Sequence, residues 1–157
     1  MSDFLARHNF AVEIVVSGLG GDEGFAKGRG AFSEVTGLET GFDATSIREG
    51  GYHTGLRQLL GKPTATPLVL KRGMTLDAAF WTWVQRCQDG TYPLPYVDGT
   101  VRMFGPRGEA DEATITWAFT GGIVTKVKAS DLTARSASEV PIEELSIAHE
   151  GLTRRDA

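Results

Sequence analysis

Segments in which every second residue is hydrophobic recur along this chain. The alternating hydrophobic side chains are Phe10, Val12, Ile14 and Val16 in residues 10–17, and Ala113, Ile115, Trp117 and Phe119 in residues 113–119. A period of two residues is typical of a β-strand with one buried face. The sequence predicts further extended segments at residues 31–36, 40–47, 67–72, 100–104, 123–128 and 140–152.

Glycines, prolines and breaks in the period predict how these segments are connected. Turns are expected near Gly37 and at residues 106–108, which read Pro-Arg-Gly. The glycine pair at 121–122 lies between two strand-like segments and predicts a β-hairpin. Residues 131–137 are expected to form a short helical turn. The period slips at Glu143 and Glu144, which indicates a β-bulge.

One segment has a helical period instead. Its hydrophobic residues are spaced at i, i+3, i+4, i+7, i+8 and i+11: Leu76, Ala79, Phe80, Trp83, Val84 and Cys87. This spacing predicts an amphipathic helix that Thr75 caps and Gly90 ends. Trp81 lies outside the hydrophobic stripe. It is compatible either with a broader buried face or with a surface that contacts a partner.

Two glycine-rich polar segments, residues 18–30 and about 48–63, are interpreted as long loops because they lack the pattern of buried elements. The order of strands, one helix and more strands contains no βαβ alternation. The fold expected for residues 1–157 is therefore a single mainly β (α+β) domain. It would be a small antiparallel β-barrel or sandwich with one packed α-helix.

Composition narrows the classes of function. The formal net charge is −4 and the basic residues are not clustered, so the sequence does not support binding of nucleic acid through its phosphates. Cys87 is the single cysteine, which excludes an intrachain disulfide. No stretch has the length and hydrophobicity of a signal peptide or membrane span. We expect synthesis in the cytoplasm and no membrane anchor.

The histidines and glycine motifs do not predict a site for a metal or a nucleotide. His8, His53 and His149 lack metal-ligand spacing, and His149 is expected to be an ordinary surface or interface residue. The glycines at 18–21 fail as a dinucleotide loop because Glu23 replaces the last glycine of that motif. Gly61-Lys62 likewise fails as a phosphate loop, because Pro63 replaces the hydroxyl residue.

The remaining candidates for chemistry have structural explanations. Cys87 lies on the hydrophobic stripe of the helix and is expected to be a buried thiol. Glu143 and Glu144 are neighbours in a strand, so they should point to opposite faces and be solvated or salt-bridged. We therefore predict no catalytic, cofactor-binding or metal-binding residues, and no enzymatic activity.

Seven short motifs follow one another along the chain. They are Phe10-Ala-Val-Glu-Ile, Ala31-Phe-Ser-Glu-Val-Thr-Gly-Leu-Glu, Arg48-Glu-Gly-Gly, Leu68-Val-Leu-Lys-Arg-Gly, Phe80-Trp-Thr-Trp, Asp131-Leu-Thr-Ala and Val140-Pro-Ile-Glu-Glu-Leu-Ser-Ile-Ala-His-Glu-Gly-Leu. In order and spacing this series resembles the tail-tube proteins of contractile-tail phages and the inner-tube proteins of phage-derived contractile injection systems. The resemblance extends from about Phe10 to Leu152. The sequence departs from the family pattern at residues 120–122, where many relatives have a proline-containing turn.

The resemblance implies a tail-tube-like fold that assembles into homo-hexameric rings, which stack into a hollow tube inside a contractile sheath. Baseplate and terminator proteins would lie at its ends. DNA or protein effectors would pass through the lumen without sequence-specific binding. The two glycine-rich loops would connect subunits or rings, with Arg48, Glu49, Gly50 and Gly51 at ring contacts and Trp81 as a further inter-subunit contact.

Two other functions compete with a tube subunit. The first is an adaptor, terminator or baseplate component of the same superfamily, which would form one ring without polymerising. The second is a small-molecule-binding β-barrel or an enzyme, for which the sequence offers no convergent polar cluster. In a tube, edge strands of neighbouring subunits would pair, and Thr114, Thr116 and Ala118 are candidates for facing the lumen.

Overall fold

The computed structural model describes residues 10–16, 26–28, 32–76, 78–90, 92, 94–105, 113–134 and 139–156. Within these ranges the prediction of a mainly antiparallel β fold with one packed helix is confirmed. The elements are β1 (Phe10–Val16), β2 (Ala26–Gly28), β3 (Glu34–Thr36), β4 (Thr40–Ile47), β5 (Arg57–Ala65), β6 (Leu68–Gly73), α1 (Ala79–Asp89), β7 (Val97–Phe104), β8 (Ala113–Lys128), β9 (Ile142–Ala148) and β10 (Gly151–Asp156).

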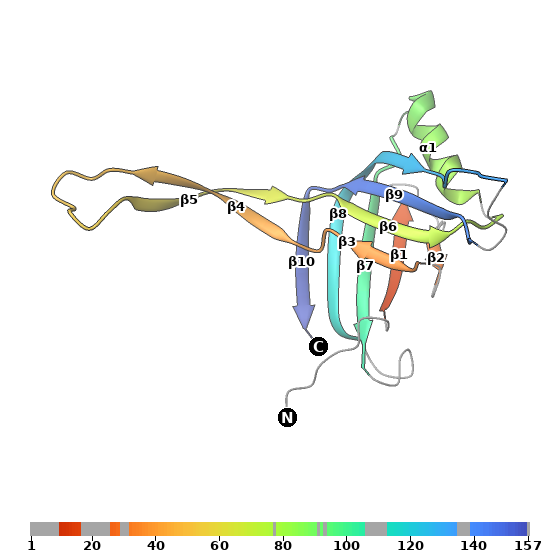
Figure 1. The fold of residues 1–157 in the computed structure, drawn as a ribbon, viewed down its shortest axis with the longest axis horizontal. Coiled ribbons are helices and arrows are strands. Elements are labelled where there is room, and N and C mark those ends of the chain that lie inside the picture. Colours follow the sequence, from red (N-terminus) through yellow and green to blue (C-terminus); the bar gives the residue numbers. More distant parts are fainter. Residues whose placement is uncertain are drawn as a thin grey trace.

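Eight of the strands form one continuous antiparallel sheet that folds over on itself (Figure 1). The order is β2-β1-β7-β8-β9-β6-β3, with β10 paired to β8 beside this path. The described strands do not close into a barrel, so the sandwich-like alternative of the prediction is the better description. The half with β1 and β7 and the half with β6 and β9 pack against each other around a hydrophobic core.

Strand β8 connects the two halves of the sheet. Its first part pairs with β7 and β10, and residues 123–128 pair with β9. The hairpin predicted at Gly121 and Gly122 is therefore wrong, because the strand runs through both glycines and bends there. Gly121 has a φ of 62°, and a Cβ on Gly122 would lie only 2.9 Å from Val97 and 3.0 Å from Ile147. The glycines permit a bend and a close approach of side chains instead of a turn.

The helix closes one end of the core. Phe80 and Trp83 are buried, Phe80 stacks on Phe32 with ring centroids 5.8 Å apart, and Trp83 Nε1 donates to the Pro95 carbonyl at 2.7 Å. Gly90 ends the helix in a left-handed conformation, as predicted. The predicted start is wrong, because the N-cap is Ala78 and the helix begins three residues after Leu76, which is fully exposed.

Other predicted connections need correction or lie outside the described residues. Residues 26–28 of the predicted 18–30 loop form β2 and pair with β1; most of that loop and the turn at 106–108 lie outside the described residues. Residues 131–134 are not helical, and 135–137 lie outside the description. The bulge predicted at Glu143 and Glu144 is wrong, because β9 pairs regularly with β6 there. The irregularity lies instead at Thr125 of the facing strand.

The loop predicted at residues 48–63 is also wrong. Residues 57–65 form strand β5, which pairs with β4 in a separate two-stranded sheet. This hairpin, residues 40–65, projects from the body as a long arm (Figure 1). We call it the arm. Every residue of β5 is exposed, so its sequence shows no alternation between buried and exposed positions.

Candidate assembly surfaces

The arm has two chemically different faces. Cross-strand partners share a face, and the register pairs Thr40 with Ala65, Phe42 with Pro63, Ala44 with Leu60 and Ser46 with Gln58 on one side. The opposite side carries Asp43, Thr45, Ile47, Arg57, Leu59 and Thr64. The first side is the more continuously apolar, and we call it the apolar arm face. It includes Phe42 and Leu60, which are 55% and 78% exposed.

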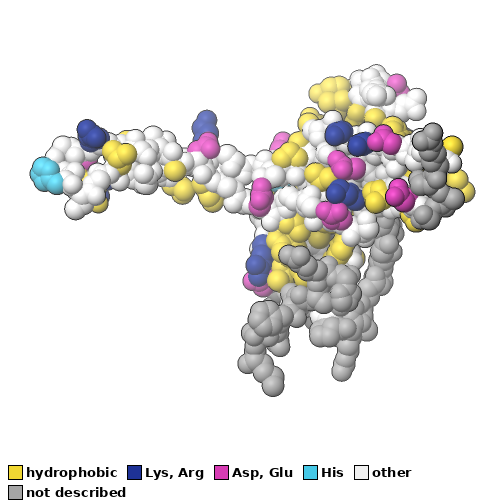
Figure 2. All heavy atoms as spheres, viewed as in Figure 1, with side chains coloured by type: hydrophobic (Ala, Val, Ile, Leu, Met, Phe, Trp, Pro, Cys, Tyr) yellow, Lys and Arg dark blue, Asp and Glu magenta, His cyan; other side chains and the backbone are white. Residues whose placement is uncertain are grey.

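The described part of the body gives the apolar arm face no cover. Figure 2 shows hydrophobic side chains spaced along the arm, with charged groups and a histidine toward its end. A monomer with no partner leaves such side chains in water, although burying a Leu or Phe side chain contributes about 1.5–3 kcal/mol. An exposed apolar surface of this kind marks an interaction site.

The predicted ring-contact residues lie together at the tip of the arm. Arg48, Glu49, Gly50 and Gly51 begin the connection between β4 and β5, and all four are exposed. Gly51 has a φ of 88°, which favours glycine. The Glu49 carboxylate forms an ion pair with Arg57. The structure therefore groups these residues on a projecting element, and their contact with another subunit stays a prediction.

The two roots of the arm are held together where they meet the body. Thr66 Oγ1 donates to Glu39 Oε1 at 2.8 Å, and the Thr66 carbonyl oxygen lies 3.0 Å from Nε2 of His149. A Cβ on Gly37, whose φ is 89°, would collide with the Pro67 carbonyl. His149 is buried, with its Nδ1 lacking a hydrogen-bond partner. The expectation of an ordinary surface or interface residue is therefore wrong, because the histidine supports the base of the arm.

Trp81 lies on the helix, at the end of the body away from the arm (Figure 1). It is 44% exposed, and its Nε1 donates to Glu143 Oε1 at 2.6 Å. Glu143 is buried and pairs with Arg72 at 2.8 Å, while the Arg72 guanidinium lies 3.8 Å from the Phe80 ring centre. Trp81 therefore fits neither the buried-face nor the partner-surface interpretation alone, because a hydrogen bond anchors its indole while part of the ring faces solvent.

Other exposed hydrophobic residues lie near this end of the sheet. Gly73 pairs with Ile142, Met74 N donates to the Pro141 carbonyl at 2.8 Å, and Val140 lies beside Gly73. Met74, Val140 and Ile142 are all exposed. Trp81 reaches this end of the sheet through its hydrogen bond to Glu143, and we call the four exposed residues the Trp81 patch. It is a second candidate surface for contact with a partner.

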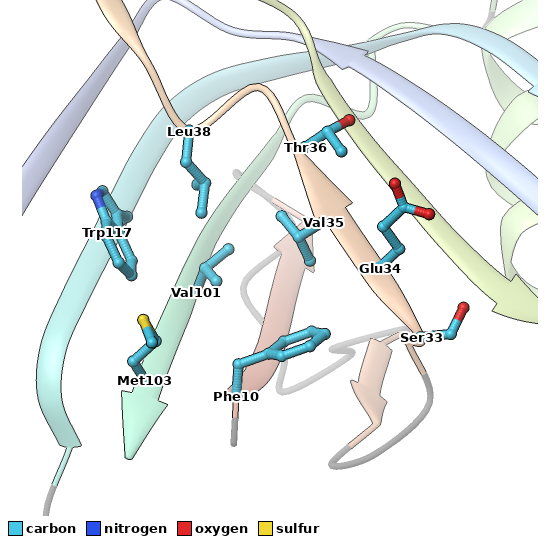
Figure 3. Close-up of a pocket in the computed structure, with 9 residues that line it drawn as sticks. All are labelled: Phe10, Ser33, Glu34, Val35, Thr36, Leu38, Val101, Met103 and Trp117. Carbon is cyan, nitrogen blue, oxygen red and sulfur yellow. The ribbon is translucent and has the colours of Figure 1, made fainter. Parts of the chain in front are cut away.

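A groove of about 490 Å³ opens between the two halves of the sheet. Six side chains from β1, β3, β7, β8 and the β3–β4 connection converge on it in Figure 3: Phe10, Val35, Leu38, Val101, Met103 and Trp117. Ser33, Glu34 and Thr36 border it. We call it the intersheet groove. Sequence reasoning missed it because its residues come from separate segments that only the folded sheet brings together.

The described residues offer little for catalysis. They contain no group of three or more His, Cys, Asp or Glu side chains placed to hold a metal ion. Burial raises the pKa of the Cys87 thiol, which disfavours the nucleophilic thiolate at neutral pH. Glu143 and Glu144 point to opposite faces, as predicted, and Glu143 is satisfied by its ion pair. No described helix is long and apolar enough to cross a membrane.

Comparisons with known proteins identify one family model and several solved structures that are similar to this chain. The family model described as "T4-like virus tail tube protein gp19" matches residues 6–153. A search of curated proteins gives no match. Among solved structures, a chain in the anti-feeding prophage (AFP) baseplate has a TM-score of 0.80 at 19% identity, covering 99% of this chain and 98% of its own.

Two further structures have the same fold. A chain in the PVC sheath–tube complex of an extracellular contractile injection system has a TM-score of 0.76 at 18% identity, with 99% of this chain and 94% of that chain covered. A type six secretion system protein has a TM-score of 0.51 at 19% identity, with 92% and 82% covered. At these identities the likeness establishes the fold alone.

Proposed function

Because this chain belongs to the family of T4-like virus tail tube proteins gp19, we propose that six copies form a ring and that the rings stack into the hollow inner tube of a contractile particle. The observation that carries this proposal is the arm. It projects beyond the body and exposes an apolar face that its own described chain does not cover. Projecting apolar elements are stable in water when a neighbouring copy covers them.

The position of the arm supports the proposed polymerisation. A contact between the arm of one copy and a different surface of the next is heterologous, and heterologous contacts produce closed rings or open stacks. We propose that Arg48, Glu49, Gly50 and Gly51 at the tip contact the neighbouring ring. In the same proposal Trp81 contacts an adjacent subunit, and Thr114, Thr116 and Ala118 face the lumen.

The remaining parts of the proposal concern partners and cargo. A contractile sheath would surround the tube, and baseplate and terminator proteins would close its ends. DNA or protein effectors would pass through a lumen that has no sequence-specific site. The protein would act without enzymatic activity. It would be synthesised in the cytoplasm and assembled into a phage tail or an injection particle.

A single-ring component is the second candidate. Solved structures of an AFP baseplate and of an AFP tube-terminating cap contain chains as similar in fold to this one as the sheath–tube complex does, with TM-scores of 0.80 and 0.76. An adaptor, terminator or baseplate ring therefore accounts equally well for the fold. Stacking distinguishes the two candidates, because only a tube subunit polymerises along the axis.

Negative-stain electron microscopy of the concentrated protein at neutral pH tests the proposal directly. We expect hollow tubes, or rings that stack as the concentration rises. In a matched variant an Asn-Gly turn replaces Ser46–Gln58 and joins the cross-strand pair Thr45 and Leu59, leaving the body unchanged. This variant should form rings without tubes. Wild-type protein that stops at single rings supports the adaptor, and a monomer at every concentration contradicts both.

A further inference from the structure

The strands of the arm continue β3 and β6 of the body, but within the described residues 32–76 the strand pairing is interrupted where the arm begins. Thr36 pairs with Val69 at the end of the body, and Thr40 pairs with Ala65 at the start of the arm. Three residues lie between these pairs on each strand, so the register is the same on both sides. The interruption therefore inserts no extra residue and removes only the pairing.

Backbone groups at the interruption have partners other than the facing strand. The Glu39 N–H donates to the Gly37 carbonyl oxygen at 2.8 Å, within its own strand. Pro67 has no N–H to donate. The Thr66 carbonyl oxygen lies 3.0 Å from Nε2 of His149, which follows β9. Pairing between the strands therefore does not stiffen the chain here as it does on either side.

We propose that residues 37–39 and 66–68 form a hinge on which the arm turns as a unit relative to the body, and that His149 is the positioning residue that holds the arm in the direction of Figure 1. We call these residues the arm hinge. The motion itself is a property of the single subunit. Its consequence for assembly rests on the proposed function, because a contact repeated between copies needs one direction of the arm.

The arm has the properties of a separate moving unit. Its two strands form their own sheet and pair with no described strand of the body. On the body side of the arm hinge the chain is fixed, because Leu38 packs against the core and Leu68 is buried. On the arm side every residue of β5 is exposed. The bending points are therefore Glu39 and Thr66, which lie between the packed body and the exposed arm.

His149 acts on one of these bending points from the body. Its ring is buried beside Phe119, with the ring centroids 5.9 Å apart. A carbonyl oxygen only accepts hydrogen bonds, so Nε2 is the nitrogen that donates to Thr66. The Thr66 hydroxyl in turn donates to Glu39 Oε1 at 2.8 Å. Thr66 is thus tied to the core through His149 and to the facing hinge strand through Glu39, and these two hydrogen bonds resist rotation of the arm.

Distances between pairs of spin labels, measured by double electron–electron resonance, test the hinge in dilute protein that light scattering shows to be monomeric. All variants carry Cys87→Ala. The first pair joins Thr54→Cys near the tip of the arm to Gln88→Cys on α1. A second pair joins Gln88→Cys to Lys126→Cys within the body, and a third joins Thr40→Cys to Thr54→Cys within the arm. All four labelled positions are exposed.

Three substitutions change the hydrogen bonds at the arm hinge. Thr66→Val removes the hydroxyl at nearly constant volume, His149→Leu removes the ring donor, and His149→Gln keeps an N–H donor as the matched control. The eight residues of β4 span about 26 Å, so a rotation of about 20° moves the end of the arm by about 9 Å. We expect Thr66→Val and His149→Leu to widen the arm-to-body distance distribution by roughly 9 Å. His149→Gln should keep the narrow distribution of the wild type.

Assembly provides a second readout. Loss of one of these hydrogen bonds should lower the population of the arm direction that assembles by about two- to tenfold, and the apparent affinity between copies falls by the same factor. The concentration needed for tubes should rise accordingly in Thr66→Val and His149→Leu. In His149→Gln it should stay within about twofold of the wild type.

The outcomes separate this inference from the proposed function. An arm-to-body distribution that stays narrow in both Thr66→Val and His149→Leu would overturn the proposal. Widening of the pair within the arm would assign the motion to the hairpin itself, and widening of the pair within the body would show a disturbed fold; either result would also overturn it. The distances come from unassembled protein, so wild-type protein that forms no tubes would contradict the proposed function and leave the test of the hinge intact.

Discussion

The buried ion pair between Arg72 and Glu143 gives a prediction whose size follows from the structure. Both side chains are about 4% exposed, and Glu143 also accepts a hydrogen bond from Trp81 at 2.6 Å. Glu143→Leu removes the carboxylate and leaves the guanidinium facing an apolar side chain. Loss of one partner of a buried pair costs about 3–5 kcal/mol, a large fraction of a typical free energy of unfolding of about 5–15 kcal/mol.

Replacing both charges should recover most of that loss. In Arg72→Met with Glu143→Leu, neither charge is buried, and the methionine still covers the Phe80 ring on which Arg72 lies. Such replacements are often neutral or stabilising. Trp81→Phe removes only the indole donor, and a hydrogen bond to a charged group contributes about 1.5–3 kcal/mol. Because Trp81 is partly exposed, we expect the lower end of that range.

Urea unfolding of dilute, unassembled protein, followed by far-ultraviolet circular dichroism, measures these differences. With a slope of about 1–3 kcal/mol per molar urea, Glu143→Leu should lower the midpoint by at least about 1 M. The double variant should lie close to the wild type. The reasoning is refuted if Glu143→Leu costs less than about 1 kcal/mol, or if the double variant is as unstable as the sum of the single ones.

Three further outcomes follow from particular contacts. Gly99→Ala should lower the free energy of unfolding, measured in urea, by about 1–3 kcal/mol, because its Cβ would lie 2.5 Å from the buried Phe119 ring. As a control, Gly50→Ala has open space around its Cβ. It should change the free energy of unfolding by less than about 0.5 kcal/mol. Gly37→Ala should be at least as costly as Gly99→Ala in the same assay, since it meets the Pro67 carbonyl at a positive φ. Burial raises the pKa of Cys87, so iodoacetamide should alkylate it more slowly than a peptide thiol at pH 8. The stability linked to this thiol is present below its unfolded pKa of about 8.5 and is lost as pH rises through the higher folded value; a Cys87→Ala variant should lack that alkaline decline.

Periodic segments with one buried face were predicted well from the sequence. The bounds of β4 agree with the prediction, β1 begins at the predicted Phe10, and Gly90 ends the helix. Each of these elements packs one face on the core, so its hydrophobic residues recur with the period of a strand or helix. The start of the helix was predicted wrongly from the sequence, because the hydrophobic spacing extends to Leu76 although the chain becomes helical only after Ala78.

The errors arise where tertiary structure overrides local signals. Strand β5 has no period because both of its faces are exposed, and a polar segment containing Gly61 and Pro63 reads as a loop. At Gly121 and Gly122 the sequence has a hairpin signal. In the structure the strand continues through a bend there, and Val97 and Ile147 pack so closely that a Cβ on Gly122 would not fit. Neither outcome is visible without knowing which strands become neighbours.

The candidate surfaces were predicted in part. The family resemblance implied a contact segment at residues 48–51, and the structure places these residues on the arm; their contact with another subunit stays a prediction. Trp81 was identified because it lies off the helical stripe. The apolar arm face depends on the register between β4 and β5, including its shift at Phe42. The intersheet groove depends on which segments the sheet brings together, so neither surface has a signature in one segment.

The base of the arm explains how an exposed hairpin can give a repeated contact of fixed geometry. Its strands continue directly into β3 and β6, which pair with each other in the body. Glu39 and His149 both hold Thr66 between these strands, and Gly37 allows the close approach of Pro67. The core therefore sets the direction of the arm. In the proposed stack, changes at the tip would alter the strength of a contact between copies, whereas its orientation would be inherited from the fold, as a regular stack of identical subunits requires.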